Sequence, residues 1–87
     1  MFGLGKSKEE KLALKIERIM MTIEMASQKG NHDVVLVSIN QLSSSLQKLN
    51  SDTDWDELQL LAFLTDRGLV KSLKDISIDQ WADNILN

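Results

Sequence analysis

Apolar residues recur at three- and four-residue spacing through the first third of the chain. This spacing predicts an α-helix, because such residues share one face when each residue turns the helix by about 100°. The main apolar face comprises Leu12, Ile16, Ile19, Met20, Ile23 and Ala26. Leu14, Met21 and Met25 fall on the opposite side of the same helix. A helix with two apolar faces is either packed on both sides within its own domain or covered by another chain.

Local signals predict where this first helix begins and ends. Ser7 and Glu10 have the spacing of a capping box, and Gly30 is typical of a residue just beyond a helix end. A heptad pattern divides the charged positions into an acidic flank of Glu10, Glu17 and Glu24 and a basic flank of Lys11, Lys15, Arg18 and Lys29. We expect these flanks to be solvated edges that set the orientation of helix pairing.

Residues 33–39 are rich in β-branched side chains and could be taken for a strand. The continuation favours a helix, because apolar residues keep an alternating four- and three-residue spacing at Val35, Ile39, Leu42, Leu46 and Leu49. Asn31 or Asp33 is the predicted N-cap. Since only residues 30–32 separate the two helices, we expect an antiparallel helical hairpin.

The second half of the chain predicts shorter helices. Residues 50–57 indicate a turn and a helix start, with Asp54 and Glu57 at capping-box spacing. Residues 58–64 are apolar on nearly every side, which predicts a helix at the buried centre of the domain, ending at Gly68. Residues 69–76 suggest a short fourth helix, and Ser77 with Gln80 predicts the cap of a last one. Trp55 and Trp81 are interpreted as core residues rather than interface anchors.

The composition agrees with one all-α domain spanning residues 1–87, in which residues 1–6 form a flexible start. The chain has 87 residues, 43% of them hydrophobic and 26% charged, with no proline and four glycines. These values favour a small bundle of four to five helices, led by the long hairpin and closed by short C-terminal helices. The absence of cysteine excludes disulfides and thiolate chemistry. It fits a cytoplasmic location, and no apolar run is long enough to span a membrane.

Charge is unevenly distributed along the chain, whose net charge is −3. Residues 1–30 contain six basic and four acidic side chains, a net charge of +2. Residues 31–87 contain four basic and nine acidic side chains, a net charge of −5. The acidic part would repel a phosphate backbone, so nucleic acid is an unlikely partner for the protein as a whole. The row Lys8, Lys11, Lys15 and Arg18 is the best candidate if nucleic acid is bound.

Several short motifs resemble catalytic or ligand-binding sites but are incomplete. Residues 3–7 end like a phosphate-binding loop, without the first glycine or the preceding strand. Asp52, Asp54 and Asp56 match the first ligands of an EF-hand, yet Glu57 replaces the required glycine and Phe63 the closing glutamate. A helix-turn-helix over residues 55–74 would have a recognition helix of barely two turns between acidic residues.

The sequence offers little for catalysis, because its one histidine, His32, lies alone in a predicted turn. We therefore expect no enzymatic activity, cofactor or metal. The favoured hypothesis is a protein–protein interaction module, acting as an adaptor, inhibitor or regulator and forming a homodimer. Its predicted contact has Leu14, Met21 and Met25 at the centre, with a charged rim of Lys11, Arg18, Glu17 and Glu24. The alternative is a nucleic-acid-associated regulator that uses the basic flank of the first helix.

Overall fold

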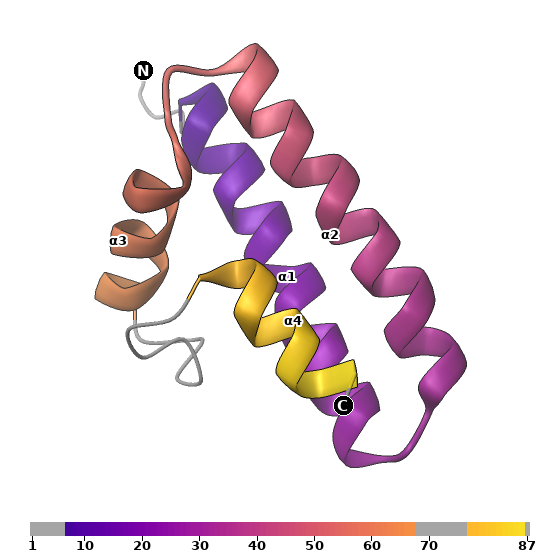
Figure 1. Ribbon diagram of the computed structural model, residues 1–87. Coiled ribbons are helices and arrows are strands. Elements are labelled where there is room, and N and C mark those ends of the chain that lie inside the picture. Colours follow the sequence, from indigo (N-terminus) through magenta and orange to yellow (C-terminus); the bar gives the residue numbers. More distant parts are fainter. Residues whose placement is uncertain (1–6, 68–76, 87) are drawn as a thin grey trace.

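The structure is a computed structural model that describes residues 7–67 and 77–86. These residues form four helices: α1 (Lys8–Gln28), α2 (His32–Asp52), α3 (Glu57–Arg67) and α4 (Ile78–Leu86). The prediction of an all-helical protein is confirmed, and the helix count is consistent with it. In Figure 1, α2 lies along one side of α1 and runs in the opposite direction, whereas α3 lies on the other side of α1.

The start of α1 is fixed by the predicted capping box. The backbone N–H of Glu10 donates a hydrogen bond of 3.1 Å to the Ser7 hydroxyl oxygen. In return, the Ser7 backbone N–H donates to the Glu10 carboxylate at 3.2 Å. Two amides that the first helical turn leaves without a helical partner are thereby satisfied.

Gly30 ends α1 and reverses the chain. Its φ of +72° is the left-handed conformation that glycine adopts without steric cost. The Gly30 N–H donates to the Ser27 carbonyl at 3.1 Å, and the Asn31 N–H donates to the Ala26 carbonyl at 2.9 Å. This pair of bonds is a Schellman motif. Asn31 then caps α2 by accepting a hydrogen bond from the Val34 N–H, which leaves only residues 29–31 between the two helices.

The core is built around α1, which supplies six of the thirteen apolar side chains that are buried among the described residues. These six are Ala13, Ile16, Ile19, Met20, Ile23 and Ala26. Helix α2 adds Val35, Leu42 and Leu49 from its predicted apolar face, and Trp81 of α4 is buried in the same cluster. The expected core position of Trp81 is therefore confirmed, whereas Trp55 is half-buried at the edge of the cluster.

The prediction that residues 58–64 form the buried centre of the domain is wrong. Leu60 and Leu64 of α3 are fully buried, but Leu58 on the same helix is 75% exposed. The physical reason is that α1 already occupies the centre, between α2 and the short helices. Helix α3 therefore buries one face only, and its remaining apolar side chains are exposed or half-buried.

The turn before α3 also differs from the prediction. Helix α2 continues to Asp52, and the cap of α3 is Asp56 rather than Asp54. The Gln59 N–H donates to the Asp56 carboxylate at 3.0 Å, and the Asp56 N–H donates to the Gln59 side-chain oxygen at the same distance. This is the reciprocal pattern of a capping box, displaced by two residues because several acidic residues compete for the cap position.

Three predictions concern residues outside those that the structure describes. The flexible start at residues 1–6, the helix end at Gly68 and the helix expected over residues 69–76 all lie outside the described residues. At the start of α4, the Gln80 N–H donates to the Ser77 hydroxyl oxygen at 3.1 Å, as its sequence indicates. Among the helices that the structure describes, none combines the length and apolar character that crossing a bilayer requires.

Candidate functional surfaces

The second apolar face of α1 remains accessible at its C-terminal end. Met21 is 37% exposed and Met25 is 55% exposed. Leu14, the third residue of this face, is half-buried. By contrast, Ile16 and Ile23 on the main face are fully buried. We call Leu14, Met21 and Met25 the methionine face.

The charged residues predicted to surround this face do not share one environment. Lys11 and Arg18 are exposed, and Glu24 is half-buried. Glu17 differs from the expected solvated edge, because it is only 3% exposed and has an interaction partner within the chain. The helical rotation places Glu17 beside the buried Ala13 rather than beside Lys11. Glu17 is thus turned toward the core and does not belong to an accessible rim.

The basic side chains of α1 lie on its solvent side. Lys8, Lys11, Lys15 and Arg18 are all exposed. Their spacing of three, four and three residues keeps them within about 80° on the helical circumference. The half-buried or buried carboxylates Glu10, Glu17 and Glu24 form a separate row. The basic side chains of α1 are thus exposed on one side of the helix, whereas these carboxylates are half-buried or buried on another side.

A groove follows the contact between α1 and α2. Lys15 and Ile19 of α1 and Ser45 of α2 line it, together with Val37, Asn40, Gln41 and Ser44 of α2. Ile19 and Ser45 are buried and form its floor, whereas Val37 is 58% exposed. The groove thus combines one cation, polar amide and hydroxyl groups, and an apolar side chain that is open to solvent.

The groove was not predicted from the sequence, although one signal of it is present. Val34 and Val37 lie outside the seam on which Val35, Leu42 and Leu49 are buried, and both remain exposed. Exposed valines on the outer side of an amphipathic helix are a departure from its pattern. The rest of the groove could not be identified in this way, because its polar residues resemble an ordinary solvated helix surface.

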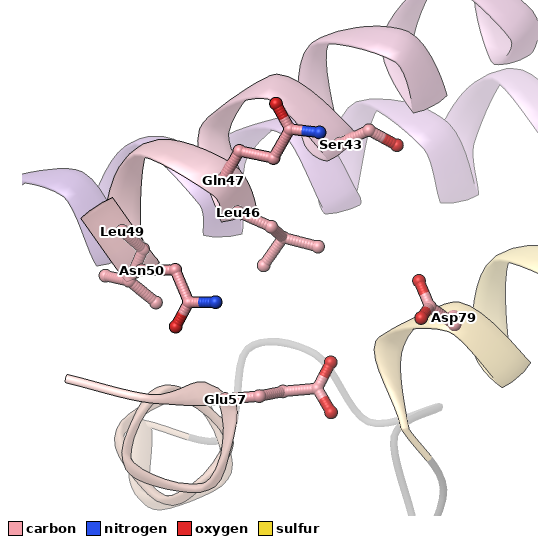
Figure 2. Close-up of a pocket in the computed structure, with 7 residues that line it drawn as sticks. All are labelled: Ser43, Leu46, Gln47, Leu49, Asn50, Glu57 and Asp79. Carbon is pink, nitrogen blue, oxygen red and sulfur yellow. The ribbon is translucent and has the colours of Figure 1, made fainter. Parts of the chain in front are cut away.

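A second hollow lies between α2, α3 and α4 (Figure 2). It is lined by Ser43, Leu46, Gln47, Leu49 and Asn50 of α2, with Glu57 of α3 and Asp79 of α4. In Figure 2 the carboxylates of Glu57 and Asp79 come from two different helices and face the same space. Within residues 7–67 and 77–86, no group of three or more metal-ligating side chains is present. Two carboxylates at an open hollow do not define a metal site.

The remaining candidate residues from the sequence lie at helix caps and helix ends. Asp56, the third EF-hand-like ligand, caps α3, and Asp52 is the last residue of α2. Ser7, at the end of the phosphate-loop-like sequence, caps α1. His32 is exposed at the first turn of α2. The second half of the helix-turn-helix candidate lies outside the described residues.

Comparison with known proteins gave no match to a protein family, to a curated protein or to a solved structure.

Proposed function

We propose that this protein is a non-enzymatic protein–protein interaction module, acting as an adaptor, inhibitor or regulator in the cytoplasm. In this proposal, α1 and α2 form a helical hairpin that leads a small bundle, and the solvent side of α1 contacts the partner. The observation that carries the proposal is the exposure of Met21 and Met25 on a helix whose opposite side lies in the core. Exposed, flexible thioether side chains suit contacts that adapt to a partner surface.

Charged residues beside the methionine face support the same proposal. Lys11 and Arg18 are exposed next to it and would fix the orientation of a bound partner. Glu24 is half-buried near the C-terminal end of α1 and completes the rim. Glu17 is no longer part of this surface, since its carboxylate is buried.

A second copy of the chain is the first partner that we propose, because a self-complementary apolar face is the simplest route to a homodimer. Hydrodynamic mass tests this directly. The wild-type protein should have twice the 9.8 kDa mass of one chain, and Met21→Glu should reduce it to that of one chain. Leu58→Glu, which changes an equally apolar side chain that is 75% exposed on α3, should leave the dimer intact. A wild-type protein that is monomeric at every concentration would contradict the homodimer.

The interaction module itself is tested by affinity capture from the native host, comparing the wild type with Met21→Glu. A partner bound by the wild type and by Leu58→Glu, but lost from Met21→Glu, is the expected result. Urea unfolding of the three proteins shows whether a lost partner reflects lost folding. If Met21→Glu folds normally and retains every partner, the methionine face is not the binding surface.

A nucleic-acid-associated regulator is the second candidate, supported by the exposed row Lys8, Lys11, Lys15 and Arg18. Binding through this row would release counterions from the phosphate backbone, so it should weaken steeply as salt rises. Neutralising Lys11, Lys15 and Arg18 should weaken it further. Absence of binding to a duplex at low salt would exclude this candidate.

A further inference from the structure

The open side of the α1–α2 pair carries different side chains at its two ends. Because the two helices are antiparallel, the end of α2 lies beside the start of α1 (Figure 1). Lys48 of α2 is therefore at the same end of the pair as Lys8 and Lys11 of α1. Val34 and Val37 are at the other end, near the Gly30 turn. All five side chains are exposed, and Lys29 and Asp33 are also exposed beside the Gly30 turn, so the two valines lie among charged side chains at that end of the groove.

We propose that this groove binds an acidic amphipathic helix of another protein. The buried Ser45 and the neighbouring Ser44 are small, so a third helix can approach the groove closely. Val37, beside the groove floor of Ile19, offers aliphatic surface to the apolar face of such a helix.

The charges around the groove determine which charge a bound partner should carry. Lys15 lines the groove, and Lys11 and Lys48 extend the positive charge toward its basic end. On α1 the exposed positions beside the groove include no carboxylate, because Glu10, Glu17 and Glu24 lie on the flank of the helix away from the groove. On α2 the nearby carboxylates are Asp52, one turn beyond Lys48, and the exposed Asp33, one turn before Val37; neither lines the groove. Glutamates along the bound helix would pair with the lysines, while a basic helix would be repelled.

The same cations also fit nucleic acid, but the two exposed valines at the other end of the groove favour a helix. A phosphate backbone gains affinity from a succession of cations, and Val34 and Val37 offer it none. A helix with one apolar face and acidic flanks uses both ends of the groove. This inference deepens the proposed interaction function, on which it rests, and it names a partner class for a surface separate from the methionine face.

The probe is a peptide library of about 18 residues, or five helical turns. Each member has leucines at helical spacing, and its flanking positions are randomised among Glu, Gln and Lys. Selection on the full 87-residue protein should enrich Glu over Lys at the flanks. The best binder, measured by fluorescence anisotropy, should lose at least about tenfold in affinity with Val37→Glu and with Lys15→Glu. Raising the salt concentration should weaken it as well.

Two matched controls separate this inference from the proposed methionine-face function. Leu58→Glu alters an exposed apolar side chain on α3, outside the groove lining, and Met21→Glu alters the methionine face. Both should leave the affinity for the selected peptide within about twofold of the wild type. Loss of peptide binding in Val37→Glu, with dimer mass unchanged, supports the groove irrespective of what the Met21→Glu experiment shows.

Four results would overturn the inference. The first is selection without Glu enrichment, or with enrichment of Lys. The second is a selected peptide that binds Val37→Glu as tightly as it binds the wild type. The third is a change of oligomeric mass in Val37→Glu, which would assign the groove to a second copy of the chain. Salt-sensitive retention of a DNA duplex that requires Lys15, in the absence of peptide binding, would instead assign the groove to phosphates.

Discussion

The rings of Trp55 and Phe63 pack against each other, with their centroids 5.6 Å apart and their planes inclined by 55°. Trp55 lies in the turn before α3 and Phe63 in the middle of that helix, and both are half-buried. The Trp55 N–H also donates to the Thr53 hydroxyl at 3.2 Å. The ring contact therefore links the turn after α2 to the side of α3.

This contact predicts a measurable coupling between the two aromatic residues. A double-mutant cycle with Trp55→Leu and Phe63→Leu should give a coupling free energy of about 0.5–1.5 kcal/mol, because tilted aromatic pairs stabilise beyond their buried area. The measurement is the free energy of unfolding in urea for the four proteins. Additive effects of the two substitutions, within about 0.3 kcal/mol, would show that the ring contact contributes nothing.

Because α3 buries only one face, the same substitution should lower the stability strongly at one of its leucines and hardly at all at another. Leu64→Ala should lower the free energy of unfolding by about 2–5 kcal/mol, because Leu64 is fully buried and its truncation leaves a cavity. Leu58→Ala should change it by less than about 0.5 kcal/mol, since Leu58 is largely exposed. Urea unfolding of both variants makes the comparison. Equal losses would restore the interpretation of α3 as a helix buried on all sides.

The cap of α3 distinguishes between two nearby aspartates. Asp56→Ala removes the carboxylate that accepts the Gln59 N–H, and should cost about 1 kcal/mol of stability. Asp54→Ala is the matched control, and we expect a change below about 0.5 kcal/mol because Asp54 is exposed in the turn. Hydrogen exchange at the Gln59 amide should accelerate only in the Asp56 variant. The reverse order would place the cap at Asp54, as its sequence spacing first indicates.

Gly30 should resist replacement by alanine although there is space for a side chain. An added Cβ would meet nothing within 4 Å, so the cost comes from the backbone angle alone. At a φ of +72° we expect Gly30→Ala to lose about 1–2 kcal/mol. Gly30→Asn should lose less, since asparagine tolerates this conformation better. Thermal unfolding of the two variants tests the order, and an alanine variant as stable as the wild type would refute the backbone explanation.

The sequence predicts α1 well because both of its ends depend on nearby residues. Ser7 needs only Glu10 to form its capping box, and Gly30 needs only its own backbone freedom. The position of α3 depends instead on what lies beside it. Residues 58–64 are equally apolar whether the helix is central or lateral, so the sequence pattern alone could not separate the two.

The same limit applies to the candidate surfaces. Glu17 and Lys11 both look like exposed charged residues in the sequence, and only the packing of the other helices buries one of them. The groove requires the pairing of Ile19 with a segment of α2 that is about 18 to 26 residues away in sequence. Met21 and Met25 could be assigned to a second face, but their exposure depended on the placement of every other helix.

The short link at residues 29–31 has a consequence for the order in which the protein forms. Helices joined so closely meet at a small entropic cost of loop closure, whereas α3 and α4 must reach α1 across longer stretches of chain. We therefore expect α1 and α2 to associate early, with the side that bears Val37 and Lys15 complete before the C-terminal helices dock. During synthesis, a partner of that side would meet the nascent chain first and would act on its folding as well as on its finished form.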